Sequence, residues 1–167
     1  MSNLNKWIEV YQSPTLHLRI RAAEGLLNLG GRLPLDILLN ILDRIEELGL
    51  GAKTEKILKQ RRDPELLDEM MKRLTSSKDY LREIACTVLG ELHNWAATPH
   101  LLARLDDPNW WVRRKAGFAL AELKDPSSVE GILRRYQKYP KEDINVRMAL
   151  ECALDELGVN YIRHPFP

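Results

Sequence analysis

One stretch of this chain indicates its fold: residues 112–123, which read VRRKAGFALAEL. An arginine follows a branched apolar residue, small and apolar residues come next, and a leucine closes the motif. The motif around Arg113 recurs around Arg19, Arg82 and Arg147. Arg82 and Arg113 are 31 residues apart, Arg113 and Arg147 are 34 apart, and the 63 residues from Arg19 to Arg82 are about two periods. Helical repeats of this length are typical of an α-solenoid.

The segments before these motifs repeat with the same period. Leu74, Leu105 and Tyr136 are each 31 residues apart, and apolar residues recur around them at helical spacing. Each repeat is therefore predicted to be a pair of helices. The first helices are expected at residues 4–11, 35–48, 65–74, 99–105 and 129–139, and the repeats at residues 3–30, 33–62, 64–93, 97–124 and 127–158.

The second repeat is the most divergent. One period after Arg19 the chain reads Leu50-Gly51, so this copy lacks the arginine. It carries instead a run of basic residues, Lys53, Lys56, Lys59, Arg61 and Arg62, part of which shares one helix face. Two interpretations stay open: a solvated outer face, or a contact with an acidic partner or a phosphate.

The composition is that of an ordinary globular protein. The 167 residues are 44% hydrophobic and 29% charged, with a formal net charge of +1. A balanced charge gives no reason to expect a polyanionic partner. No apolar run is long enough for a signal peptide or a membrane span, so we expect a cytoplasmic protein with no membrane partner. Cys86 and Cys152 are expected to be buried or neutral thiols rather than a disulfide.

Residues 107–123, DPNWWVRRKAGFALAEL, resemble the HEAT repeat in its short bacterial form, the phycobilisome-lyase HEAT-like repeat. The other copies resemble it less closely, and together they cover nearly the whole chain. The resemblance implies an all-α fold, a right-handed superhelical α-solenoid of about five HEAT-like helix pairs, in one domain spanning residues 1–167. The family includes protein-binding scaffolds, chromophore lyases, a DNA-repair branch and metal-binding hydroxylases, so fold alone does not define the function.

The resemblance also implies a structural role for the recurring arginine, which in such repeats bonds to an acid or carbonyl of the preceding turn or of the next repeat. An arginine fork matches a carboxylate in geometry. Candidate acids precede three of the arginines: Asp79 before Arg82, Asp106 and Asp107 before Arg113, and Asp143 before Arg147. We therefore expect these arginines to connect repeats rather than to act in catalysis.

Helix geometry separates the core from the surface. At about 100° per residue, the positions one, five and eight residues after each arginine point away from the apolar sector, and in a solenoid they should line the concave face. These candidate groove residues are Ile20, Glu24, Leu27, Glu83, Thr87, Arg114, Phe118, Met148, Cys152 and Asp155. An apolar strip with a charged border is typical of a protein or peptide site, although burial against neighbouring repeats would explain the same residues.

Trp110 and Trp111 lie in the turn before the fourth of these helices. The two rings cannot easily both point inward, so one is expected at the surface. Tryptophan is frequent among interface hot spots, and the pair is our candidate for a partner contact. The alternative is that Trp95, Trp110 and Trp111 fill large voids in the core.

The sequence favours a non-catalytic module that binds another protein or peptide in its concave groove, with no cofactor and no metal. It has no glycine-rich phosphate loop, and its four histidines are scattered. Two other classes stay open: a phycobilin lyase-like or chromophore-protein chaperone subunit, and a nucleic-acid-binding solenoid. The second would use basic residues that include Arg113, Arg114, Lys115, Arg134, Arg135 and Lys138.

The C-terminal tail, residues 159–167, leaves the repeat pattern. Its two prolines oppose a further helix. Tyr161, Ile162 and Phe166 are predicted to fold back over the last repeat as a cap, and Trp7, Ile8 and Tyr11 are predicted to cover the other end.

Overall fold

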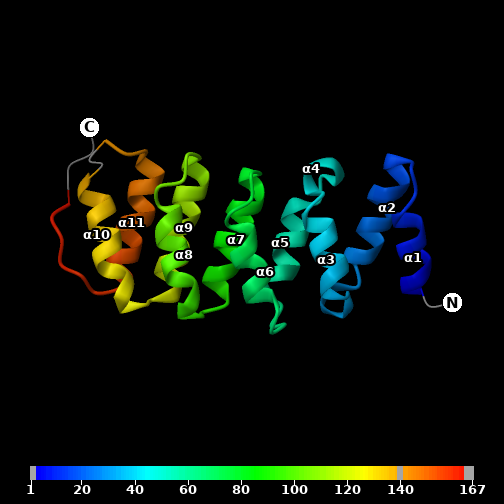
Figure 1. Ribbon diagram of the computed structural model, residues 1–167, viewed down its shortest axis with the longest axis horizontal. Coiled ribbons are helices and arrows are strands. Elements are labelled where there is room, and N and C mark those ends of the chain that lie inside the picture. Colours follow the sequence, from blue (N-terminus) through cyan, green and yellow to red (C-terminus); the bar gives the residue numbers. More distant parts are fainter. Residues whose placement is uncertain (1–2, 139–140, 164–167) are drawn as a thin grey trace. The chain divides into compact units, whose positions relative to one another are not determined.

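The computed structural model describes residues 3–138 and 141–163. Every regular element in these residues is helical, with eleven α-helices and three short 3-10 helices (Figure 1). The chain divides into two compact units, Met1–Leu66 and Leu67–Pro167. The predicted all-α class is confirmed. No helix in the described ranges combines the length and apolar character needed to cross a membrane.

The first unit consists of short helices that pack around a leucine-rich core. They are α1 (Asn3–Tyr11), α2 (Leu16–Leu27), η1 (Gly30–Arg32), α3 (Leu35–Leu42), α4 (Ile45–Leu48) and α5 (Gly51–Lys59). Helix α1 packs on α2, and α3 and α4 pack on α5. The indole ring of Trp7 lies so close to Gly25 that a Cβ there would meet it at 2.7 Å. Tyr11 is buried, and its hydroxyl donates to Asn40 at 3.1 Å.

The second unit repeats one arrangement of helices. Its elements are α6 (Leu66–Arg73, which begins at the boundary), α7 (Asp79–Glu91), η2 (Trp95–Ala97), α8 (Thr98–Arg104), α9 (Trp110–Leu123), η3 (Pro126–Ser128), α10 (Val129–Lys138) and α11 (Ile144–Glu156). Helix α9 packs against both α7 and α11, α8 packs on α9, and α10 packs on α11. These are the stacked helix pairs of an α-solenoid with HEAT-like repeats, as predicted.

Small residues let the second helices of neighbouring pairs approach closely. A Cβ on Gly90 of α7 would lie 2.9 Å from the backbone Cα of Ala119 on α9. A Cβ on Gly117 of α9 would lie 2.9 Å from the Cβ of Ala149 on α11. Gly90, Ala119 and Ala149 are all buried. The packing of α9 between its two neighbours therefore depends on the absence of side chains at two points.

One predicted helix is broken. The segment 35–48 was expected to be continuous, but α3 ends at Leu42 and α4 starts at Ile45. At the break the amide of Arg44 donates to Ile41, three residues back, instead of four, and Arg44 adopts a non-helical conformation with φ −120° and ψ 13°. Gly49 then ends α4 with a positive φ of 67°, which glycine adopts without strain. The right-handed superhelix and the single domain stay predictions.

The predicted C-terminal cap is correct for one residue. The ring of Tyr161 meets Tyr136 edge to face with centroids 5.5 Å apart, and its hydroxyl donates to Asp155 at 3.1 Å. Burial and this bond to Asp155 raise the pKa of Tyr161 to about 12. Ile162 is 83% exposed, so its predicted role in the cap is wrong. Phe166 lies outside the described residues.

Candidate functional site

The recurring arginines bind the turn that precedes their own helix. Arg19, Arg82 and Arg113 each donate through Nη1 to two backbone carbonyls, six and five residues earlier. The pairs are Ser13 and Pro14 for Arg19 (3.1 and 2.9 Å), Ser76 and Ser77 for Arg82 (2.9 and 3.2 Å), and Asp107 and Pro108 for Arg113 (2.8 and 3.1 Å). The three helices therefore share one register relative to their turns.

The same arginines also bind an acid of the following repeat, as the ladder prediction requires. Arg19 pairs with Glu47, and Arg113 pairs with Glu142 at 2.9 Å. The Arg82 fork is bidentate on Asp107, at 2.8 and 2.9 Å, with both side chains buried. We call these contacts the arginine ladder. Arg147 contacts two residues of its own repeat, the Tyr136 hydroxyl at 3.5 Å and Glu151 at 3.6 Å.

The predicted pairing with the ladder arginines is wrong for most of the candidate acids. Asp79 accepts from the Asn109 side chain at 2.6 Å. Asp143 caps α11 by accepting from the amide of Asn145 at 2.8 Å. An acid shortly before the arginine accepts hydrogen bonds at the start of a helix. The guanidinium group instead binds an acid of the next repeat.

A second arginine series escaped the sequence analysis. Arg104 donates to the carbonyl of Leu74 at 3.0 Å, and Arg135 donates to the carbonyl of Leu105 at 2.7 Å. Both bonds span 30 residues, so they join neighbouring repeats. The signal was present in the sequence, because Arg73, Arg104 and Arg135 are each 31 residues apart.

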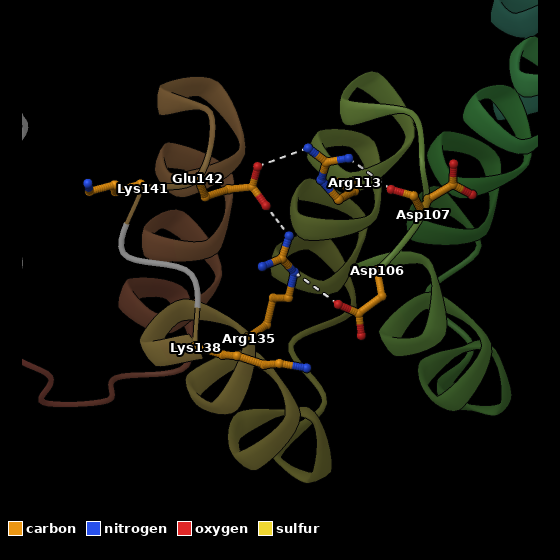
Figure 2. Close-up of a pocket in the computed structure, with 7 residues that line it drawn as sticks. All are labelled: Asp106, Asp107, Arg113, Arg135, Lys138, Lys141 and Glu142. Carbon is orange, nitrogen blue, oxygen red and sulfur yellow. Dashed lines mark hydrogen bonds and ion pairs between the residues drawn. The ribbon is translucent and has the colours of Figure 1, made fainter.

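The two arginine series meet in a charged cleft of about 590 Å³ between the fourth and fifth pairs (Figure 2). Its lining residues are Asp106, Asp107, Arg113, Arg135, Lys138, Lys141 and Glu142. Figure 2 shows the Glu142 carboxylate held between two guanidinium groups, with Asp106 on the other side of Arg135. Although burial alone would raise it, the hydrogen bond from Arg113 and the charge of Arg135 hold the pKa of Glu142 below its usual value. These ion pairs connect α9, α10 and the turn before α11.

The predicted groove residues of the second unit lie on one face at two of the three positions. Because α7 and α9 share the ladder register and α11 carries Arg147 at the same motif position, residues at equal offsets occupy equivalent faces. The residues after the arginine are Glu83, Arg114 and Met148, and those four further on are Thr87, Phe118 and Cys152. All six are partly or fully exposed, with Met148 at 53%. We call these six residues, with Trp111, the second-helix face.

The third predicted position points inward. Leu27 is only 2% exposed, so its assignment to the groove is wrong. The equivalent residues Gly90 and Ala121 are buried as well, because neighbouring second helices approach each other there. Asp155 is exposed at this position, at the end of the array. In the first unit, on α2, Ile20 is half-buried and Glu24 is exposed.

An aromatic and cationic cluster forms the centre of the second-helix face. The rings of Trp110 and Trp111 stack with centroids 4.2 Å apart and planes inclined by 27°. The guanidinium carbon of Arg114 lies 5.3 Å from the ring centroid of Trp111 and 5.3 Å from that of Phe118. Trp111 is 44% exposed, so the predicted surface tryptophan is correct. Rings at this distance attract a cation through their electron-rich faces.

Trp95 does not fill a void. It is 57% exposed, and its indole N–H donates to the carbonyl of Leu123 at 3.0 Å. This bond joins the third and fourth pairs at the ends of their second helices. The void-filling interpretation is therefore wrong for Trp95 and for Trp111.

The basic run of the second repeat is partly engaged within the first unit. Lys53 donates to the Asn28 side chain at 2.6 Å. Arg61 pairs with Asp63 at 2.5 Å and donates to the carbonyl of Leu33. The hydrogen bond to Arg61 lowers the pKa of Asp63. Arg61 thus joins the segment after α5 to the segment before α3.

Reactive or ligating groups are sparse in the described chain. Cys86 is a buried free thiol, and burial raises its pKa. Cys152 is a partly exposed free thiol whose pKa is also raised by desolvation. Within residues 3–138 and 141–163, no three His, Cys, Asp or Glu side chains are grouped so that they could hold a metal ion.

Comparison with known proteins supports the repeat. Residues 98–158 match the family model of HEAT repeats. This match supports a HEAT-repeat protein and covers the fourth and fifth helix pairs, where α9 carries the motif first quoted above. No curated protein sequence matches the chain.

Solved structures share the fold across nearly the whole chain. An engineered protein from a structural genomics consortium is similar with a TM-score of 0.59 and 16% identity, over 94% of this chain and 80% of that protein. Human deoxyhypusine hydroxylase in complex with glycerol is similar with a TM-score of 0.55 and 18% identity, over 93% of this chain and 73% of that protein. At these identities the likeness establishes the fold alone.

Proposed function

We propose that this protein is a non-catalytic module that binds another protein or peptide on the second-helix face. The observation that supports it most is the cluster of Trp111, Arg114 and Phe118, in which Trp111 is exposed and the other two are half-buried. Met148, in the position on α11 that is equivalent to Arg114, is exposed as well. Tryptophan and arginine dominate binding energy at protein interfaces, and methionine adapts to different apolar partners. Single apolar residues exposed to solvent are common on protein surfaces. A stacked pair of aromatic rings beside a cation, by contrast, is a preformed contact surface.

The structure offers less support for a nucleic-acid partner. Arg113 and Arg135 are paired with Glu142, and Arg134 is paired with Glu130 at 2.7 Å. A phosphate track requires several cations that are available to the ligand. These arginines are already bound to acids, so the partner we propose is a protein.

The narrower likeness to the short bacterial, phycobilisome-lyase form also belongs to this proposal, since the family match is to HEAT repeats in general. A cytoplasmic location is proposed with it, because free thiols such as Cys86 and Cys152 suit a reducing compartment. Incubation with a bilin distinguishes the lyase-like alternative, which would leave the protein coloured after denaturing purification.

The test compares proteins captured by four forms of the full chain: wild type, Trp111→Asp, Met148→Asp and Ile162→Asp. Both face residues are exposed, so the variants should keep the wild-type helical circular dichroism. Ile162, 83% exposed and outside the second-helix face, is the matched control. We expect a partner that wild type and Ile162→Asp retain and that both face variants lose. The same set of captured proteins with all four forms would refute the proposal.

A further inference from the structure

The second-helix face contains one cation whose hydrogen-bond donors have no acceptor in the described residues. Arg114 contacts the rings of Trp111 and Phe118, and over residues 3–138 and 141–163 it makes no hydrogen bond or ion pair. By contrast, the neighbouring Arg113 donates to two carbonyls and to Glu142. Arg114 is thus positioned by aromatic rings while its guanidinium donors stay available.

The acids on and beside this face interact within the chain. Asp155 accepts from Tyr161 at 3.1 Å and from Arg163 at 2.7 Å. Glu83 also interacts within the chain. Arg114 is the cation of this face, it pairs with no acid among residues 3–138 and 141–163, and it lies beside the exposed ring of Trp111.

Resting on the proposed function, we infer that Arg114 recognises a carboxylate of the partner, an acidic side chain flanked by apolar residues. Guanidinium groups bind carboxylates through two parallel N–H bonds, and stacking on rings holds the fork in place before the partner arrives. The apolar neighbours of that carboxylate would contact Trp111 and Met148. A single carboxylate suits one available cation, whereas a polyanion would also meet the carboxylate of Glu83 on this face.

The inference is tested with a library of short random peptides displayed on phage and selected on the full-length protein. Peptides that the uncharged variant Met148→Gln releases define ligands of the face. We expect these to be enriched in Asp or Glu next to an aliphatic or aromatic residue. Selected peptides that need Met148 but show no acidic preference would overturn the inference and leave the proposed function standing. A library that yields no peptide dependent on Met148 would count against the face itself, and so against both.

A double-mutant cycle identifies the contact. The best acidic peptide and its amide counterpart, with Asp replaced by Asn or Glu by Gln, are titrated against wild type and Arg114→Gln. We expect the amide to bind wild type about tenfold more weakly and Arg114→Gln to bind both peptides equally. Arg134→Gln removes the same charge from α10 and should keep the tenfold preference. A preference that survives in Arg114→Gln, or an oligonucleotide that competes through Arg114, would overturn the inference.

Discussion

Arg82 shows how one residue at a fixed position can join two repeats. Its guanidinium binds two carbonyls of the preceding turn and both oxygens of Asp107 in the next repeat. The backbone N–H of Asn109 also donates to the Asp107 carboxylate, at 3.0 Å. A buried charge is tolerated only when it is paired and hydrogen-bonded, and here both members meet that condition. The pair therefore specifies how consecutive repeats dock.

Arg82→Met should destabilise the protein strongly. The substitution keeps much of the side-chain volume but leaves Asp107 buried without its main partner. Breaking a buried pair from one side costs about 3 kcal/mol, and urea denaturation followed by circular dichroism measures the loss. Arg134→Met is the control, since its pair with Glu130 is exposed and should contribute less than about 1 kcal/mol. Equal losses for the two variants would contradict a structural role for the ladder.

At the scale of elements, helix α9 is held between two neighbours at points where no side chain intervenes. Gly90 meets the backbone of Ala119, and Gly117 meets Ala149. Glycine inside a helix usually lowers its stability relative to alanine by about 1 kcal/mol. At these two positions the close packing of the helices compensates for that loss.

Gly90→Ala should therefore destabilise the protein, against the usual gain from such a change. The new Cβ would lie 2.9 Å from a backbone atom of Ala119, so the two helices must move apart, at a cost of about 2 kcal/mol. Gly131→Ala in α10 is the matched control, because its Cβ would meet only the flexible end of Leu102. Thermal melts should show a lower midpoint for Gly90→Ala and an unchanged or higher one for Gly131→Ala. A higher midpoint for both would show that the contact is not restrictive.

The helices were predictable because their pattern repeats, and the exceptions have local causes. The motif places α7, α9 and α11 to within a few residues. The break between α3 and α4 follows no periodicity, since it arises from the conformation of Arg44. The angular rule correctly exposes Arg114 and Met148 but fails for Leu27, because it treats a helix alone and ignores the neighbour that covers that position. The stacking of Trp111 with Arg114 requires coordinates, although both residues were candidates.

At the scale of the whole molecule, the arginine contacts lower the pKa of several carboxyl groups in the folded chain relative to the unfolded chain. Hydrogen bonds from arginines lower the pKa of Glu47 and Asp63 in the first unit. In the second, burial opposes the effect, but the bonds from Arg82 and Arg113 still lower the pKa of Asp107 and Glu142. The stability of both units should therefore depend on pH in the same direction.

Stability should accordingly fall as the solution becomes acidic. These carboxylates are ionised in both states at neutral pH, so the stabilisation from their lowered pKa is then fully present. Below about pH 5 the unfolded chain binds protons first, and the stabilisation is lost as pH approaches the lower pKa of the folded state. Urea midpoints measured from pH 7 to about pH 3 should decrease, and Asp107→Asn, which cannot titrate, should be less stable at neutral pH with a shallower decrease. A wild-type profile that is flat over this range would mean that the ladder acids do not contribute through their ionised forms.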